Sequence, residues 1–170
     1  MSNIMVRQAE STDFPFIHEL LSHLGYSTPL EKVRQALPSL LQNSEYRCLL
    51  AVWKPNGQVV GMMTLRTTTC LRLGGLQVSI EELVVHQDWR GQGIGHTLIA
   101  HALEHARTCG SVRLEVLTSQ NRLSAQRGFY EKAGFRKADS WVYRLDFFQG
   151  ASEAPKETRQ STLKSSGDSL

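Results

Sequence analysis

The sequence contains no apolar run long enough to cross a membrane. A membrane-spanning helix needs roughly 18 consecutive apolar residues, and no stretch of the 170-residue chain approaches that length. The first ten residues also lack the charged-then-apolar pattern of a secretory signal. We therefore expect a cytoplasmic protein that has no membrane as a partner.

Cysteine is scarce, and basic residues are not gathered into blocks. Three widely spaced cysteines, Cys48, Cys70 and Cys109, form neither a disulfide framework nor a zinc pattern, so we expect no metal. The 19 lysines and arginines give a net charge of +3, without a basic arm or a stripe that mixes basic and aromatic residues. This distribution argues against a nucleic-acid partner.

Length and composition predict one globular domain followed by a tail. The chain is 41% hydrophobic and 21% charged, which is ordinary for a protein with an apolar core. The segment 149–170 has five serines, two threonines and no aromatic residue. Such a segment buries too little apolar surface to offset the entropy lost on ordering. We expect a domain over 1–148 and a disordered tail over 149–170.

Apolar periodicity alternates along the domain between that of strands and that of helices. Strands are expected over 4–8, 48–53, 59–69, 76–85, 112–117 and 141–147. Helices are expected from a cap at Ser11 or Thr12 to about 24, from a capping box at 28–31 to about 42, and over 95–109 and 121–133. Pro38 should kink the second helix or end it early. The order β-α-α-β-β-β-α-β-α-β predicts an α/β protein with a mixed sheet covered by helices.

A glycine-rich loop lies between an expected strand and an expected helix. Its sequence over 90–95 is Arg-Gly-Gln-Gly-Ile-Gly, in which glycines let the backbone approach a ligand closely. The helix that follows offers unpaired N–H groups and the positive end of its dipole, which together suit a pyrophosphate. Gly95 precedes His96 rather than lysine, so this is no Walker loop, and the spacing differs from the Rossmann fingerprint. A glycine-rich surface turn is the alternative on these residues alone.

The loop and its surroundings resemble the GNAT N-acetyltransferase superfamily. The segment 80–91 is similar to that family's fourth strand and acetyl-CoA loop, and Asn121, Ala125 and the segment 129–135 are similar to its fourth helix and following turn. The resemblance covers the chain from about Ile4 to Phe147. It implies acetyl-CoA as co-substrate and a fold whose fourth and fifth strands splay apart to admit pantetheine.

The resemblance also implies which residues bind acetyl-CoA. Pantetheine would bond to the main chain of the fourth strand and to the fourth helix, the loop amides would hold the pyrophosphate, and Tyr130 would lie beside the thioester sulfur. The residues so implied are Leu83, Val84, Val85, Arg90, Gly91, Gln92, Gly93, Ile94, Gly95, His96, Asn121, Ser124 and Tyr130.

Acetyl transfer to an amine makes its own demands on the residues. A carboxylate must take a proton from the amine, and the candidate bases are Glu81 and Glu82. Because neighbouring strand residues face opposite sides, at most one of the two should point into the cleft. A strand N–H freed at a bulge, for which we choose Val84, would stabilise the oxyanion. Tyr130 would protonate the departing thiolate.

The sequence therefore predicts an N-acetyltransferase that acts directly on a primary amine. A small-molecule amine is the preferred acceptor. The alternatives are a protein N-terminus or lysine and, in a different class, a regulatory module that binds acyl-CoA without turnover; a homodimer is also open. The segment 101–105 has the H-x-x-E-H spacing of a zinc peptidase, but its histidines lie opposite the apolar stripe of the helix, so we expect a solvent-exposed polar face.

Overall fold

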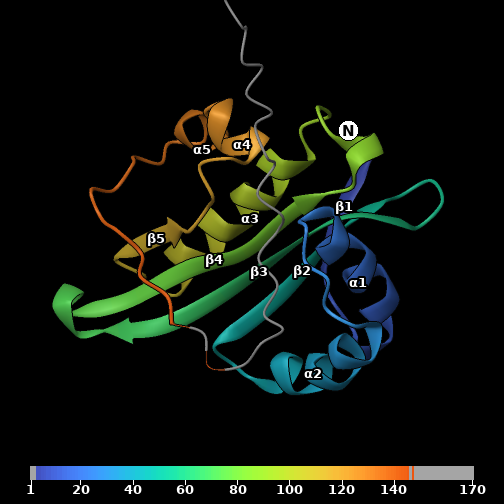
Figure 1. The fold of residues 1–170 in the computed structure, drawn as a ribbon, viewed down its shortest axis with the longest axis horizontal. Helices are drawn as coiled ribbons and strands as arrows, with labels where there is room; N and C mark the ends of the chain where they lie inside the picture. Colours follow the sequence, from blue (N-terminus) through green and yellow to red (C-terminus); the bar gives the residue numbers. More distant parts are fainter. Residues whose placement is uncertain (1–2, 146, 148–170) are drawn as a thin grey trace, which may run out of the picture.

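The computed structural model describes residues 3–145 and 147, which form an open five-stranded sheet with helices on both faces (Figure 1). The strands lie side by side in chain order: β1 (Ile4–Gln8), β2 (Tyr46–Trp53), β3 (Gln58–Cys70), β4 (Gly75–Val85) and β5 (Arg113–Val116). The first four are antiparallel neighbours, whereas β5 runs parallel to β4. The predicted α/β class and mixed sheet are confirmed.

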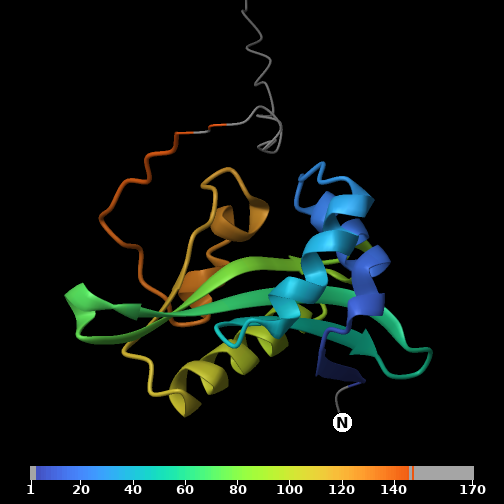
Figure 2. The same ribbon diagram turned by 90° about the horizontal axis from the view of Figure 1, so that it is seen from below.

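Helices cover the two faces of the sheet unequally. The helices α1 (Phe14–His23) and α2 (Leu30–Gln42) pack on one face and α3 (Ile94–Thr108) on the other, as Figure 2 shows. Single-turn helices α4 (Leu123–Gln126) and α5 (Phe129–Lys132) follow β5. Three short 3-10 turns, η1 (Ser11–Asp13), η2 (Leu71–Leu73) and η3 (Gln87–Trp89), join other elements.

Each face of the sheet has its own apolar core. On the α1–α2 face, Leu20 packs with Leu50 and Met62, and all three are almost fully buried. On the α3 face, Leu98 packs with Met63, both at 0% exposure. Burying each such side chain contributes about 1.5–3 kcal/mol. Because successive strand residues face opposite sides, the central strands supply both cores and read as nearly continuous apolar runs.

A β-bulge interrupts the pairing of β3 with β4. Leu65 lies opposite Ile80, but the residue before it in β3, Thr64, lies opposite Glu82 rather than Glu81. Glu81 is therefore the extra residue of the bulge, and it shifts the alternation of faces along β4.

The shift is visible in the two cores. Val78 and Ile80, before the bulge, belong to the α3 core, whereas Val84, after it, belongs to the α1–α2 core. Without the bulge, Glu82 would share the α3 face with Ile80, since the two are two residues apart. With the bulge, Glu82 shares the α1–α2 face with Val84.

An ion pair fixes the start of the α1 region on the sheet. The Arg7 guanidinium of β1 donates two hydrogen bonds to the Asp13 carboxylate, at 2.7 and 2.8 Å. The Glu10 N–H donates a third, at 2.8 Å. The hydrogen bond from Arg7 is the main reason that the pKa of Asp13 lies below its usual value, against the opposing effect of burial. Such paired donors make a buried carboxylate tolerable.

Several predicted boundaries need correction. The capping box at 28–31 does not form: Pro29 is the N-cap, with ψ of 140°, and its carbonyl accepts the first helical bonds from Lys32 and Val33. The helix does not end early at Pro38, which lies within α2.

The predicted helix over 121–133 is two separate turns. Gly128 has a left-handed φ of +62°, which ends the α4 turn and caps α5. The backbone reverses at this glycine, so apolar spacing on its two sides does not define one helix face.

The predicted strand over 141–147 is not found in the described part of that segment. Residues 141–145 have no regular structure, and Trp141 and Tyr143 are 83% and 91% exposed. An alternating pattern forms a strand only when it pairs with an edge and buries one face, and this segment does neither. The predicted tail over 149–170 lies outside the described residues. No helix among the described residues is long and apolar enough to cross a membrane.

Candidate active site

The strands β4 and β5 part before β4 ends. Their parallel pairing stops at Ile80 opposite Val116, while β4 continues to Val85. A cavity of about 590 Å³, the large cavity, lies beside the end of β4, which is paired with β3 but unpaired on its β5 side. It is lined by residues of α1 and the loop after it, β4, the glycine loop, α3, β5 and α4–α5. Its lining residues are His23, Leu24, Tyr26, Glu81, Glu82, Leu83, Val85, Arg90, Gly91, Gly95, His96, Val116, Leu117, Thr118, Arg122, Leu123, Ser124, Arg127, Phe129, Tyr130 and Lys132.

The glycine loop is an open cradle at the start of α3. Gly91 and Gly93 have φ of +80° and +81°, and a Cβ added at either would meet nothing within 4 Å. Gly93 is the N-cap of α3, so the first N–H groups of a 15-residue helix follow it. The Arg90 side chain donates to the Val85 carbonyl at 3.1 Å, which holds the loop against the end of β4.

Gly95 has a different role from the other two glycines. A Cβ at this position would lie 3.1 Å from the Phe129 ring, which already contacts the His96 ring at a centroid distance of 4.8 Å. The absence of a side chain therefore lets α5 pack against the first turn of α3. This contact closes one side of the large cavity.

Glu82 is the most perturbed acid of the site. Its carboxylate accepts hydrogen bonds from the Thr64 hydroxyl and, at 3.3 Å, from the Tyr46 hydroxyl. Its backbone N–H donates to Thr64 Oγ1 at 3.0 Å. Burial, with repulsion from neighbouring Glu81, raises the pKa of Glu82 to about 6, although the Tyr46 bond opposes the rise.

A second cavity shares one lining residue, Glu82, with the first, and we refer to Glu82 as the junction of the two. This small cavity, of about 240 Å³, lies between α1–α2 and the strands β2 and β3. Its walls are mostly apolar, and Glu82 is the one residue among those described that lines both cavities. The small cavity is lined by Ile17, Leu21, Thr28, Lys32, Val33, Ala36, Leu37, Leu40, Tyr46, Cys48, Met62, Thr64 and Glu82.

Glu81 differs sharply from its neighbour. It is exposed and lines only the large cavity. We expected at most one of the two glutamates to reach the cleft, but both border it, because the bulge at Glu81 breaks the alternation of faces. The bulge also lies elsewhere than predicted: Val84 pairs regularly with Met62 and is buried. The choice of Val84 as a bulged donor was wrong.

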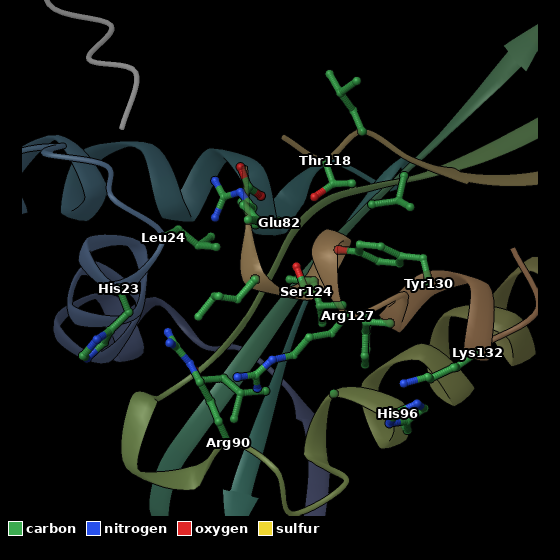
Figure 3. Close-up of a pocket in the computed structure, with 18 of the residues that line it drawn as sticks. His23, Leu24, Glu82, Arg90, His96, Thr118, Ser124, Arg127, Tyr130 and Lys132 are labelled. Atoms are coloured by element: carbon green, nitrogen blue, oxygen red, sulfur yellow. The ribbon is translucent and has the colours of Figure 1, made fainter. Parts of the chain in front are cut away.

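Tyr130 points into the large cavity from α5, as Figure 3 shows. Burial raises the pKa of its phenol, and the Thr118 hydroxyl and the Arg122 guanidinium oppose the rise. Thr118 is close enough to affect the phenol, yet its own buried hydroxyl oxygen has no hydrogen-bond partner of standard geometry among the described residues. This unsatisfied oxygen marks the wall of the cavity as suited to a polar ligand.

Most of the predicted site residues line the large cavity. Those that do are Glu81, Glu82, Leu83, Val85, Arg90, Gly91, Gly95, His96, Ser124 and Tyr130. Val84, Gln92, Gly93, Ile94 and Asn121 are not among its lining residues. Ile94 and Val84 are buried behind the wall, and the other three are exposed at the surface.

Sequence reasoning missed several cationic and polar residues of the site. Arg122 and Arg127 line the large cavity, and Figure 3 shows Arg127 reaching toward the side where Arg90 lies. The two arginines flank the short helix α4, so proximity to Asn121 was the only signal that could have indicated them. Tyr46 and Thr64 come from β2 and β3 and carry no motif.

Comparisons with known proteins place this α/β fold in one family. The acetyltransferase (GNAT) family model matches residues 6–135. The glucosamine 6-phosphate N-acetyltransferase of Trypanosoma brucei brucei is 31% identical over 146 residues, which cover 85% of this chain and 96% of that protein. The aminoalkylphosphonate N-acetyltransferase of Salmonella typhimurium is 38% identical over 96 residues, 56% of this chain and 59% of that protein.

A solved structure agrees with these matches. The crystal structure of an acetyltransferase from Trypanosoma brucei superimposes with a TM-score of 0.70 at 30% identity, covering 84% of this chain and 99% of that one. The chain belongs to the GNAT acetyltransferase family, as the sequence resemblance predicted.

Proposed function

We propose that this protein transfers the acetyl group of acetyl-CoA directly to the primary amine of a small molecule. The observation that carries the proposal is the position of Glu82, a carboxylate with a raised pKa at the junction of the large and small cavities. A group at this junction can reach a donor in one cavity and an acceptor in the other. The names of the relatives, both N-acetyltransferases of small amines, support the proposal.

The large cavity suits acetyl-CoA. The cradle at Gly91 and Gly93 leaves open space where side chains would block the amides, and the start of α3 favours an anion. Arg90 and Arg127 supply positive charge near a pyrophosphate, and the unsatisfied Thr118 hydroxyl can bond a polar group of the pantetheine. When bound there, acetyl-CoA supplies an acetyl group activated as a thioester.

Glu82 acts as the general base. A pKa of about 6 keeps its carboxylate largely ionised at pH 7 while leaving it basic enough to accept a proton. The hydroxyls of Tyr46 and Thr64 hold the carboxylate at the junction. The apolar walls of the small cavity favour the neutral form of an amine, which is the nucleophilic form.

Tyr130 acts as the general acid. Its raised pKa keeps the phenol protonated at neutral pH, and its ring places the hydroxyl inside the large cavity. A proton held there is available to a thiolate as it departs. Leu83 and Val85, at the end of β4 that has no β5 partner, offer main-chain groups to the pantetheine.

The test is release of free thiol from acetyl-CoA by the purified protein over a panel of amines. The panel includes glucosamine 6-phosphate, an aminoalkylphosphonate, a polyamine, amino acids and a peptide with a free N-terminus. Calorimetric titration with CoA is run beside it. Turnover with a small amine supports the proposal, and turnover with the peptide alone would assign the acceptor to proteins. CoA binding without turnover on any amine would identify a regulatory module instead.

A further inference from the structure

A group of potential metal ligands lies where α1 and the end of β4 approach each other. Glu19 and His23 are four residues apart on α1 and so lie on one face of that helix. His86 directly follows β4. One ligand atom from each of the three residues lies within 4.8 Å of the other two.

The three side chains already contact one another. His86 Nε2 lies 3.6 Å from Glu19 Oε1, and the rings of His23 and His86 meet edge to face with centroids 4.5 Å apart. His86 is largely buried, with a side chain 17% exposed, whereas the Glu19 side chain is 57% exposed. One ligand is therefore held rigidly by the sheet, and the carboxylate can adjust.

We propose that Glu19, His23 and His86 bind a divalent transition-metal ion such as Zn²⁺ or Co²⁺. Two imidazoles and one carboxylate form a ligand set that suits these ions. Zinc holds such ligands at about 2.0–2.2 Å, so that they lie about 3.3 Å from one another in a tetrahedron. The 3.6 Å between His86 Nε2 and Glu19 Oε1 is already near that spacing, and the other separations, all within 4.8 Å, must shorten when the ion binds.

Asp88 completes the surroundings of His86. Its backbone N–H donates to His86 Nδ1 at 3.3 Å, and its carboxylate lies 3.7 Å from the same nitrogen. Metal binding at Nε2 moves the ring proton to Nδ1, so the Asp88 N–H bond to Nδ1 is given up and Nδ1 donates to the Asp88 carboxylate instead. A carboxylate behind a ligating histidine is a recurring feature of metal sites, because it orients the ring and raises its basicity.

Three protein ligands leave a coordination position open. His23 belongs to the α1 edge of the large cavity, although Figure 3 shows its ring turned away from the other labelled side chains, so the site borders that cavity. Water can occupy the open position. The sequence gives no hint of this site, because its ligands come from separate elements. The H-x-x-E-H segment at 101–105, by contrast, does not form a metal site. His101 is exposed, and His105 hydrogen-bonds Thr67.

The test is direct metal binding by the full chain, with any affinity tag removed and the protein treated with a chelator. Calorimetric titration with ZnCl₂ should give one ion per chain. The same titration on Glu19→Gln, His23→Gln and His86→Gln should show affinity at least tenfold weaker for each, and Asp88→Asn about 10- to 100-fold weaker. His101→Gln is the matched control and should bind as the wild type does.

Cobalt gives a second readout that does not depend on activity. Co²⁺ bound at this site should show visible d–d bands without a thiolate charge-transfer band, which separates it from binding at Cys70 or Cys109. The bands should disappear in His86→Gln and persist in His101→Gln. No saturable binding by the wild type, or equal binding by His23→Gln and the wild type, would overturn the proposal. Neither outcome bears on acetyl transfer, which is measured separately.

Discussion

The two cavities that share Glu82 are lined by different kinds of structure. The large cavity is lined by the glycine loop, the first turn of α3 and the end of β4 that has no β5 partner, together with side chains of α4 and α5. The small cavity is bounded by apolar side chains of α1, α2, β2 and β3. A ligand held by main chain requires glycines at fixed positions, and these are readable in a sequence. A ligand held by the shape of side chains requires only a volume, which many sequences can supply.

The strongest test of this contrast is a side chain placed in the glycine cradle. Gly93→Asp should abolish acetyl-CoA binding, because its side chain enters the open space before α3 and its charge repels a pyrophosphate. Calorimetry with acetyl-CoA measures the loss.

Gly57→Asp is the matched control for backbone strain. Gly57 has φ of +73° and also has open space where a Cβ would lie, but it belongs to the β2–β3 turn. Both variants should fold, and Gly57→Asp should bind acetyl-CoA as the wild type does. Undiminished affinity in Gly93→Asp would refute the assignment of the loop.

The second test concerns the junction between the cavities. Glu82→Gln should lower kcat by about 10²- to 10⁴-fold, the usual range for a general base. In the wild type the rate should rise with pH through about 6, as the carboxylate ionises, and this limb should vanish in the variant. Glu81→Gln is the control, because Glu81 is exposed and lies on the large cavity alone. Equal losses in both variants would contradict the assignment of the base.

Although Glu82→Gln should lower kcat, it should raise the stability of the folded protein at alkaline pH. Because the folded state raises the pKa of Glu82 from 4.5 to about 6, it holds the proton more tightly than the unfolded chain does. That stabilisation is complete below pH 4.5 and is lost as pH rises through 6. A glutamine is neutral at every pH, so the variant should melt a few degrees higher than the wild type at pH 8. Calorimetric melts at pH 5 and pH 8 distinguish this from a change in packing.

The third test stays within the large cavity. Tyr130→Phe should lower kcat by roughly 10²-fold or more with little change in acetyl-CoA affinity, because only the proton donor is removed. Tyr143→Phe, at a tyrosine that is 91% exposed, serves as the control. A variant with wild-type kcat across pH 6 to 9 would show that the phenol is not the acid.

The smallest effect is expected in the small cavity. Ala36→Phe enlarges a side chain of α2 that is exposed but lines the small cavity, and should raise the KM for the amine by about tenfold, while acetyl-CoA affinity stays unchanged. Ala100→Phe, at an exposed position of α3, is the matched control. A rise in the KM for acetyl-CoA instead would show that the two cavities do not divide donor from acceptor.

The difference between the two cavities also explains which features could be predicted from the sequence and which could not. The order of helices and strands along the chain up to β5 and the loop at 90–95 follow from periodicity and glycine spacing, which are local properties of the chain. The bulge at Glu81 is not local, because it is defined by the pairing of β4 with β3. The orientation of Glu82 and the contacts of Tyr46 and Thr64 depend on that pairing, so they could not be predicted.

Errors of prediction concentrate after β5. The spacing of Leu123, Phe129 and Ala133 predicts one amphipathic helix, but Gly128 adopts a left-handed conformation and divides it. At 141–147 the alternation of apolar residues predicts a strand, yet alternation states only which residues could share a face. Whether a partner edge receives that face is decided by tertiary structure.

The bulge at Glu81 has a consequence for how this chain can change length. Exchange of the Glu81 side chain leaves the count of residues in β4 intact, so every later residue keeps its face. Deletion of Glu81 would remove the bulge and still leave Glu82 opposite Thr64 and Val84 opposite Met62, so both residues would keep their present faces. The bulge thus carries one residue more than the pairing with β3 needs. This part of β4 should accept both substitution and deletion of Glu81 without turning Glu82 toward the α3 core.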